Sequence, residues 1–249
     1  MISSRTPSRN CGFTARNTTS ANSTTCAFVS AFLIPSSFSY KPERLKPGIN
    51  RLNLSGESVF YGSIFPQTPI RELDIKPNTE FYLSKWTIDK NANLSLYRLF
   101  NPKELAQNKR AAVTISYVNS IRNDNTTTLL SMISSKLTSN ISSRNEYNFT
   151  ALYASYLRRN RNFCVKDEDG NEVRLRIDGF IYKSVKSTNP DELNFAFFPD
   201  VIDKWAHLQY VLRGRLNDLG DTITGFKGVY NGKEIQWSEV EKQYKFAEL

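Results

Sequence analysis

The chain has 249 residues, of which 39% are hydrophobic and 12% aromatic, so it can bury a core and is not intrinsically disordered. Three scattered cysteines (Cys11, Cys26 and Cys164) argue against a disulfide framework, and a single histidine (His207) argues against a zinc site. Of the net charge of +9, residues 1–55 carry +6, and no Lys/Arg run interleaved with aromatic residues occurs, so direct nucleic-acid binding is not expected.

The first forty residues differ from the rest of the chain, because 18 of them are Ser, Thr or Asn and none is acidic. Such a composition cannot bury enough apolar surface to fold alone. The apolar run at residues 26–34 is compatible with the core of a secretory signal or with a docked strand. Its late start, its internal Ser30 and the absence of a small-x-small cleavage site favour a docked strand or a poorly specified leader at residues 1–37 over a secretory signal. The run is too short to span a membrane as a helix. The scattered cysteines are typical of incidental thiols in a reduced protein, so we expect a cytoplasmic location.

After a proline-punctuated approach at residues 40–48, the chain carries a turn signal at 55–58 and a β-rich run at 59–61. Pro66 and Pro69 end that run. Because proline suits a first helical turn, we expect a helix to begin here, with Glu72 in its first turn, where the helix dipole favours a carboxylate. A strand end followed by a helix start is where open α/β folds build ligand sites.

The remaining elements follow from hydrophobic periodicity. In the helix expected at 148–159, the apolar residues Phe149, Leu152, Tyr153, Tyr156 and Leu157 predict one buried face. We expect further helices at 102–108 and 128–138, strands at 80–88, 112–117, 173–177 (running into 180–182) and 194–198, and a small β-rich extension with strands at 208–212, 222–230 and 234–237. The predicted class is α/β, a mixed sheet with flanking helices in one domain over residues 38–203, followed by the extension at 204–249.

The stretch from Asn50 to Gly56 (Asn-Arg-Leu-Asn-Leu-Ser-Gly), followed by Tyr61 and Glu72, resembles the opening motif of the RES-domain proteins, which are named for an arginine, a glutamate and a serine. Ser184, in the segment Asp-Gly-Phe-Ile-Tyr-Lys-Ser at 178–184, matches the family's serine, and residues 194–198 resemble its closing segment. The resemblance covers residues 38–203. The family's upstream Phe-Tyr-Arg-x-Arg segment is matched only in part by residues 13–16, with Thr14 in place of the first arginine and Arg16 in place of the second.

This resemblance implies an ADP-ribosyltransferase-like fold and cleavage of NAD⁺ at the nicotinamide–ribose bond, without a metal. The acceptor (water, phosphate or a protein side chain) stays open. The family also implies a toxin of a toxin–antitoxin pair, whose partner is a small helix-turn-helix antitoxin, and a homodimer is compatible with it. The implied catalytic residues are Arg51, Glu72 and Ser184, and the implied dinucleotide contacts are Arg16, Arg51, Asn53, Tyr61 and Tyr182.

The chemistry of these residue types agrees with that reaction. Cleavage of the nicotinamide–ribose bond passes through an oxocarbenium-like state, as glycoside cleavage does. The leaving group is already cationic, so no general acid has to protonate it, and one carboxylate such as Glu72 can stabilise the developing positive charge. The planar fork of Arg51 suits a pyrophosphate, and an aromatic side chain such as Tyr61 can stack on nicotinamide.

Each of these residues also has an ordinary structural interpretation. Taken alone, Arg51 is a surface arginine, Tyr61 a strand residue, Glu72 a helix-terminal carboxylate and Ser184 a turn residue. The second functional hypothesis is a catalytically silent module with the same fold, which engages an anionic partner through its basic N-terminal region. Binding of that kind would weaken steeply as the salt concentration rises.

Overall fold

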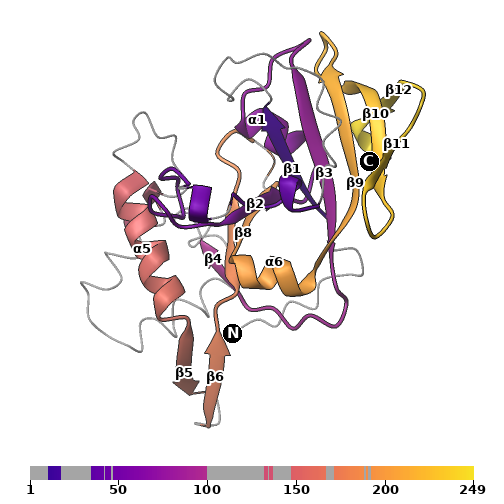
Figure 1. Ribbon diagram of the computed structural model, residues 1–249. Coiled ribbons are helices and arrows are strands. Elements are labelled where there is room, and N and C mark those ends of the chain that lie inside the picture. The colour runs from indigo at the N-terminus through magenta and orange to yellow at the C-terminus, as the bar shows by residue number, and fades with distance from the viewer. Residues whose placement is uncertain are drawn as a thin grey trace. The chain divides into compact units, whose positions relative to one another are not determined.

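The structure is a computed structural model that describes residues 11–17, 35–41, 43–45, 47–99, 132–133, 135–136, 147–166, 171–187, 189 and 192–249 (Figure 1). Contacts divide the chain into two compact units. The first unit comprises Met1–Arg5, Lys41–Phe60 and Asn93–Val201, and the second comprises Thr6–Tyr40, Tyr61–Ala92 and Ile202–Leu249. Strands outnumber helices in the described elements, and the chain is a mixed α and β protein.

The first unit contains three paired strands, β4 (Leu96–Leu99), β7 (Gly179–Lys183) and β8 (Leu193–Phe197). β7 pairs in parallel with β4 and antiparallel with β8. Phe180 on β7 is fully buried and meets Phe198 edge-to-face at 5.7 Å and Tyr97 at 6.2 Å. A separate two-stranded sheet joins β5 (Asn162–Lys166) to β6 (Glu172–Arg176). The short helix η3 (Glu43–Leu45) also belongs to the first unit.

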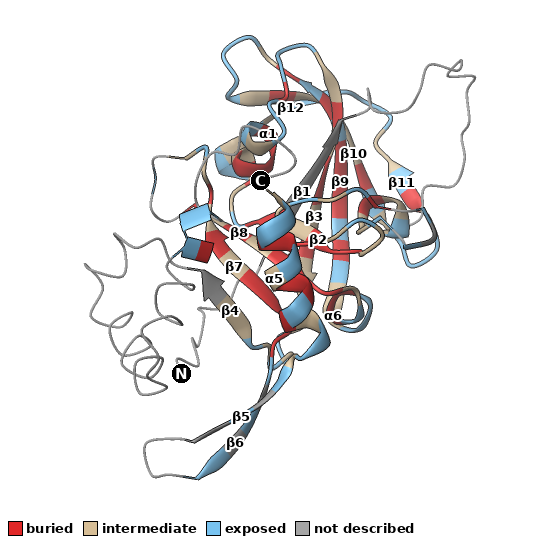
Figure 2. Ribbon diagram, turned by 90° about the vertical axis from the view of Figure 1, so that its left-hand side faces the viewer, coloured by how far each residue is buried: buried red, intermediate tan, exposed pale blue. Residues whose placement is uncertain are grey.

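Helix α5 (Tyr147–Arg159) lies within one residue of the predicted helix, but its buried face differs from the predicted one (Figure 2). The buried residues are mostly small: Thr150, Ala151, Ala154, Ser155 and Leu157. Of the residues predicted to be buried, Phe149, Leu152 and Tyr156 are exposed. Small side chains therefore occupy most of the buried face of α5, and the larger apolar side chains at 149, 152 and 156 lie on its exposed face. Tyr153 is half-buried and its hydroxyl hydrogen-bonds that of Tyr97 at 3.0 Å, while burial raises the pKa of both phenols.

The second unit is built on an antiparallel sheet in the order β11-β10-β9-β3-β1-β2, with β12 also paired to β10. Its strands are β1 (Cys11–Asn17), β2 (Phe60–Ser63, whose first residue belongs to the first unit), β3 (Glu80–Ile88), β9 (Ala206–Leu216), β10 (Thr222–Tyr230), β11 (Ile235–Trp237) and β12 (Lys242–Lys245). Its helices are η2 (Pro35–Phe38), α1 (Gln67–Glu72) and η5 (Phe246–Glu248). Helix α6 (Pro199–Trp205) crosses from the first unit into the second.

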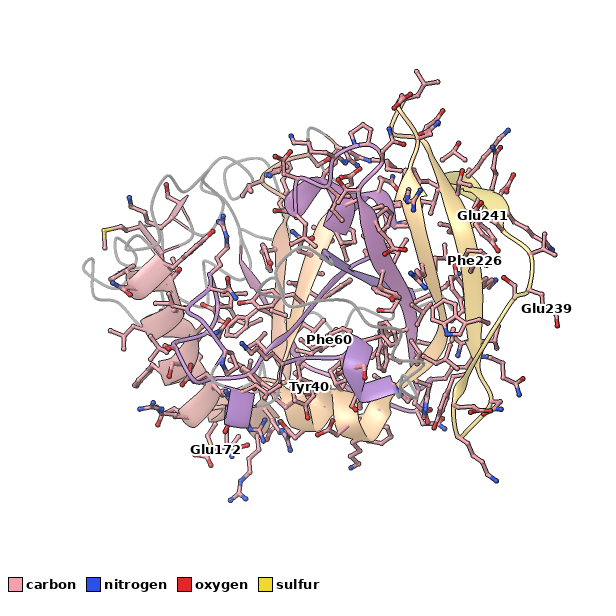
Figure 3. All side chains as sticks on the ribbon, turned by 45° about the horizontal axis from the view of Figure 1, so that its top comes forward. Tyr40, Phe60, Glu172, Phe226, Glu239 and Glu241 are labelled. Carbon is pink, nitrogen blue, oxygen red and sulfur yellow. The ribbon has the colours of Figure 1, made fainter. Side chains whose placement is uncertain are left out.

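Buried side chains that alternate with less buried ones along β3, β9 and β10 form the core of the second unit. Phe81, Leu83, Leu212 and Ile223 are fully buried in a cluster that also holds Ile70 and Ile75 beside the sheet. Successive side chains of a strand point to opposite faces, so this apolar row follows from the period of two. Figure 3 places Phe226 on β10 and the exposed Glu239 and Glu241 on the connection from β11 to β12.

This arrangement groups the chain differently from the predicted leader, domain and extension. Residues 11–17 form a strand that pairs with β3 from Cys11↔Thr87 to Asn17↔Phe81. The predicted extension begins with β9, which pairs with β3 from Glu80↔Arg215 to Ile88↔Ala206 and therefore lies inside the sheet. Strand pairing depends on partners far away in sequence, which local composition does not reveal.

The strand predicted at 80–88 matches β3, and the strand predicted at 194–198 matches β8 within one residue. The predicted helix at 102–108 and strand at 112–117 lie outside the described residues. So does most of the predicted helix at 128–138, of which residues 132, 133, 135 and 136 are helical and Ile133 is buried. Among the described residues, no helix has the length and apolar character needed to cross a membrane.

Candidate functional site

The motif at residues 50–57 folds into a closed loop held by its own hydrogen bonds. Asn53 is buried, and its Nδ2 donates to the carbonyl oxygens of Gly48 (2.8 Å), Leu54 (3.0 Å) and Glu57 (3.1 Å). Gly56 has a φ of 87°, in the left-handed region that favours glycine, and its N–H donates to Pro47 O at 2.8 Å. The predicted dinucleotide contact Asn53 thus has its amide engaged in fixing the loop.

Arg51 is presented by this loop and is half-buried. Its guanidinium lies 5.8 Å from the ring centre of Tyr147, the first residue of α5, within the range of a cation–π contact. Its Nη1 donates to Lys136 O at 3.5 Å. The loop and the aromatic ring restrict the positions that the guanidinium adopts while leaving part of it accessible.

Glu57 ties the same loop to the other end of α5. Its Oε1 accepts a hydrogen bond from Ser155 Oγ at 2.5 Å and lies 3.6 Å from Arg159 Nη2, while its Oε2 accepts from the N–H of Leu54 at 3.0 Å. The side chain is 17% exposed. The loop that carries Arg51 is therefore attached to α5 near both ends of the helix.

The sequence predicted Glu72 in the first turn of a helix, and this prediction is wrong. Glu72 is the last residue of α1. The helix begins at Gln67, with Pro66 as N-cap, so that Pro69 falls inside the first turn, where its missing N–H leaves no hydrogen bond unmade. Glu72 is half-exposed, at the end of the helix where the dipole disfavours a carboxylate. Helix capping thus does not explain a carboxylate here.

The other predicted site residues are distributed over both units. In the second unit, Tyr61 is half-buried on β2, and Arg16 lies on β1 in register with Tyr82. In the first unit, Tyr182 on β7 and Ser184 just after it are both buried. The N–H of Ser184 donates to Glu192 O at 2.9 Å, which closes the connection between β7 and β8.

A charged depression of about 380 Å³ was not predicted from the sequence; it is lined by Glu43, Glu57, Arg158, Arg159, Arg161 and Asp200. Arg161 holds Asp200 through two hydrogen bonds of 2.9 Å, Arg158 pairs with Glu43 at 3.1 Å, and Arg176 pairs with both Asp200 and Asp178. The run Arg158-Arg159-Asn160-Arg161 is the sequence feature that could have indicated this depression, because closely spaced arginines need carboxylate partners. With acidic and basic groups balanced, we interpret the depression as a structural ion-pair network.

The pKa values in this network follow its pairing. Burial alone raises the pKa of Asp200, but the hydrogen bonds from Arg161 and the charges of Arg161 and Arg176 outweigh it, so this pKa lies below its ordinary value. The same hydrogen bonds, against the effect of burial, raise the pKa of Arg161. Both groups stay charged at neutral pH, as a structural ion pair requires.

In the part of the chain that the structure describes, no group of three or more His, Cys, Asp or Glu side chains is arranged to hold a metal ion. Comparison with known proteins gives no assignment: no family model, no curated protein and no solved structure matches this chain.

Proposed function

We propose that the chain is a RES-like enzyme with an ADP-ribosyltransferase-like fold that cleaves the nicotinamide–ribose bond of NAD⁺. The observation that carries this proposal is the loop at 50–57, in which buried Asn53 and Gly56 fix the backbone and leave Arg51 partly accessible. A loop fixed this strongly around one partly exposed arginine is typical of a preorganised binding site.

Each residue of the motif has a role in the proposed reaction. Arg51 binds the pyrophosphate through paired hydrogen bonds, and Tyr61 stacks on nicotinamide. Glu72 stabilises the positive charge that develops on the ribose as the bond to nicotinamide breaks. Ser184, which matches the family's serine, stays in the proposed catalytic set; it is buried just after β7.

The biological role proposed from the resemblance is that of a toxin that depletes NAD⁺ or transfers ADP-ribose to an acceptor. Its partner would be a small helix-turn-helix antitoxin. Water, phosphate and a protein side chain are all chemically competent acceptors, because the oxocarbenium-like state reacts with weak nucleophiles.

The test is to incubate the purified full-length chain with NAD⁺, with and without phosphate, and to measure nicotinamide by chromatography. We expect nicotinamide release that falls in the Arg51→Ala variant through weaker dinucleotide binding. Arg174→Ala, which removes an exposed arginine from β6 in the same unit, is the matched control and should keep the parent rate. A folded sample that releases no nicotinamide at high protein concentration contradicts the proposal.

A further inference from the structure

Two lysines of the second unit lie on the apolar face of its sheet. Lys85 on β3 is directly opposite Tyr210 on β9, and Lys227 on β10 is directly opposite Leu212, two residues further along β9. Directly paired residues, and residues two apart on one strand, project from the same face of a sheet. Tyr210 and Leu212 belong to the hydrophobic cluster of this unit, so both lysines share the face that builds this cluster.

The ammonium groups of the two lysines lie at one aromatic ring. The Nζ of Lys227 is 4.0 Å from the ring centre of Tyr210, and the Nζ of Lys85 is 5.4 Å from the same centre. Both distances are within the range of a cation–π contact. Lys85 also donates a hydrogen bond to the backbone oxygen of Leu249, which accepts a second one from the Tyr210 hydroxyl at 3.1 Å. The ring and these hydrogen bonds keep the two positive charges close together.

Burial and repulsion both act on the amine of Lys227. Burial disfavours its charged form, and the charge of Lys85 disfavours that form further, so the pKa of Lys227 lies below its ordinary value. A lysine with an ordinary pKa is protonated at neutral pH and is then a poor nucleophile. Desolvation and a neighbouring cation are the two ways in which proteins activate a lysine amine.

Packing does not account for lysine at these two positions. Two like charges brought close together repel each other. Apolar side chains at 85 and 227 would instead continue the buried rows of Phe81 and Leu83 on β3 and of Ile223 on β10. Ionisable groups that are perturbed by burial together with a specific charged neighbour are concentrated at functional sites. The arrangement around Tyr210 therefore points to chemistry at Lys227.

From these observations we propose that Lys227 forms an imine with a small aldehyde or ketone that carries an anionic group, and that Lys85 binds this group. The amine of Lys227, after releasing its proton to solvent, adds to the carbonyl carbon. The resulting carbinolamine loses one water and leaves a C=N bond. An ammonium has three N–H donors, so Lys85 can bind an anion while it keeps its hydrogen bond to Leu249. This inference does not depend on the proposed NAD⁺ chemistry.

Labelling with pyridoxal 5′-phosphate tests the proposal on the full-length chain. Borohydride reduces each imine to a stable secondary amine, and peptide mass spectrometry then shows which lysines formed one. We expect Lys227 to carry several-fold more label than Lys233 and Lys242, which are exposed lysines of the same unit. Pyridoxal, which has the aldehyde without the phosphate, should label Lys227 less than its phosphate does. Label spread evenly over the three lysines overturns the proposal.

A pair of variants tests the part assigned to Lys85. Lys85→Met removes the neighbouring charge and keeps a long side chain, so labelling of Lys227 by pyridoxal 5′-phosphate should fall several-fold. The matched control is Lys90→Met, which removes an exposed lysine just after β3 and should leave this labelling unchanged. Circular dichroism checks that both variants are folded. Equal labelling of Lys227 in the two variants, or equal labelling by pyridoxal and by its phosphate, contradicts the assignment of Lys85.

Discussion

The side-chain amide of Asn53 holds its loop closed by donating to the carbonyl oxygens of Gly48, Leu54 and Glu57. The motif predicts a dinucleotide contact, whereas the side chain is 2% exposed and its amide is distributed over three carbonyl oxygens of its own loop. A motif shows which residue type occupies a position, but an Asn that binds a ligand and an Asn that holds its own loop are the same letter in the sequence. The sequence predicts Glu57 only as part of the turn at 55–58. Its link to α5 could not be predicted, because no local pattern shows that Ser155 lies beside it.

Replacement of Asn53 by Ala should destabilise the chain by about 1–3 kcal/mol, because it leaves buried carbonyl oxygens without a donor. Urea unfolding measures this loss. The control is Asn148→Ala on the exposed side of α5, which should stay within about 0.5 kcal/mol of the parent. Equal effects of the two substitutions would show that the amide of Asn53 does not hold the loop.

For Glu72, we expect Glu72→Gln to lower turnover of NAD⁺ by about 10²–10³-fold, because the charge that stabilises the transition state is removed while size and hydrogen bonding are kept. Dinucleotide affinity should change much less, since ground-state NAD⁺ carries less positive charge at the ribose. The thermal midpoint should stay or rise slightly, since the carboxylate ends α1 on the side that the dipole disfavours. Nicotinamide release and thermal unfolding are the measurements, with the exposed Glu239→Gln as control. Turnover at the parent rate would end the assignment of Glu72.

At the scale of elements, local periodicity predicted the strand at 80–88, which matches β3, and the helix at 148–159, which matches α5 within one residue, because each carries a strong repeating pattern. The same reasoning placed the start of α1 too late, since Pro66 and Pro69 lie three residues apart and either can open a helix. It missed β5 and β12, which are only five and four residues long. Of the apolar residues that it assigned to one face of α5, Leu157 is buried and Tyr153 half-buried, whereas Phe149, Leu152 and Tyr156 are exposed, because hydrophobicity alone does not show that Ala and Ser fill the buried face.

The inverted face of α5 leads to a packing prediction. Ala154→Leu should cost about 1–3 kcal/mol of stability, because a larger side chain does not fit a fully packed site. Leu152→Ala changes volume on the opposite, exposed face and should stay within about 0.5 kcal/mol of the parent. Urea unfolding compares the two variants. A larger loss for Leu152→Ala would mean that the buried and exposed faces have been exchanged.

For the molecule as a whole, the mixed α and β class follows from the sequence, but the two compact units do not. The motif that runs from Arg51 to Tyr61 crosses from the first unit to the second at Phe60, and nothing in its composition marks that boundary. The predicted site residues are accordingly assigned to different units: Arg51, Asn53, Tyr182 and Ser184 to the first, and Arg16, Tyr61 and Glu72 to the second.

Binding of NAD⁺ should appear as increased stability of the full-length chain, because a ligand that binds only the folded state raises the free energy of unfolding by RT ln(1 + [L]/Kd). The Glu72→Gln background keeps the dinucleotide intact during the measurement. At a hundredfold excess over Kd the gain is about 2.7 kcal/mol, which corresponds to a rise of roughly 5–10 °C in the thermal midpoint for a chain of this size.

Adding Arg51→Ala to that background should remove most of the rise, since the pyrophosphate contact is lost while the folded state is kept. Adding Arg174→Ala should leave the rise intact, because this exposed arginine on β6 lies outside the motif. Differential scanning calorimetry over a series of NAD⁺ concentrations separates the outcomes. An equal rise in both double variants would move the dinucleotide away from Arg51, and no rise in any variant would remove NAD⁺ as the ligand.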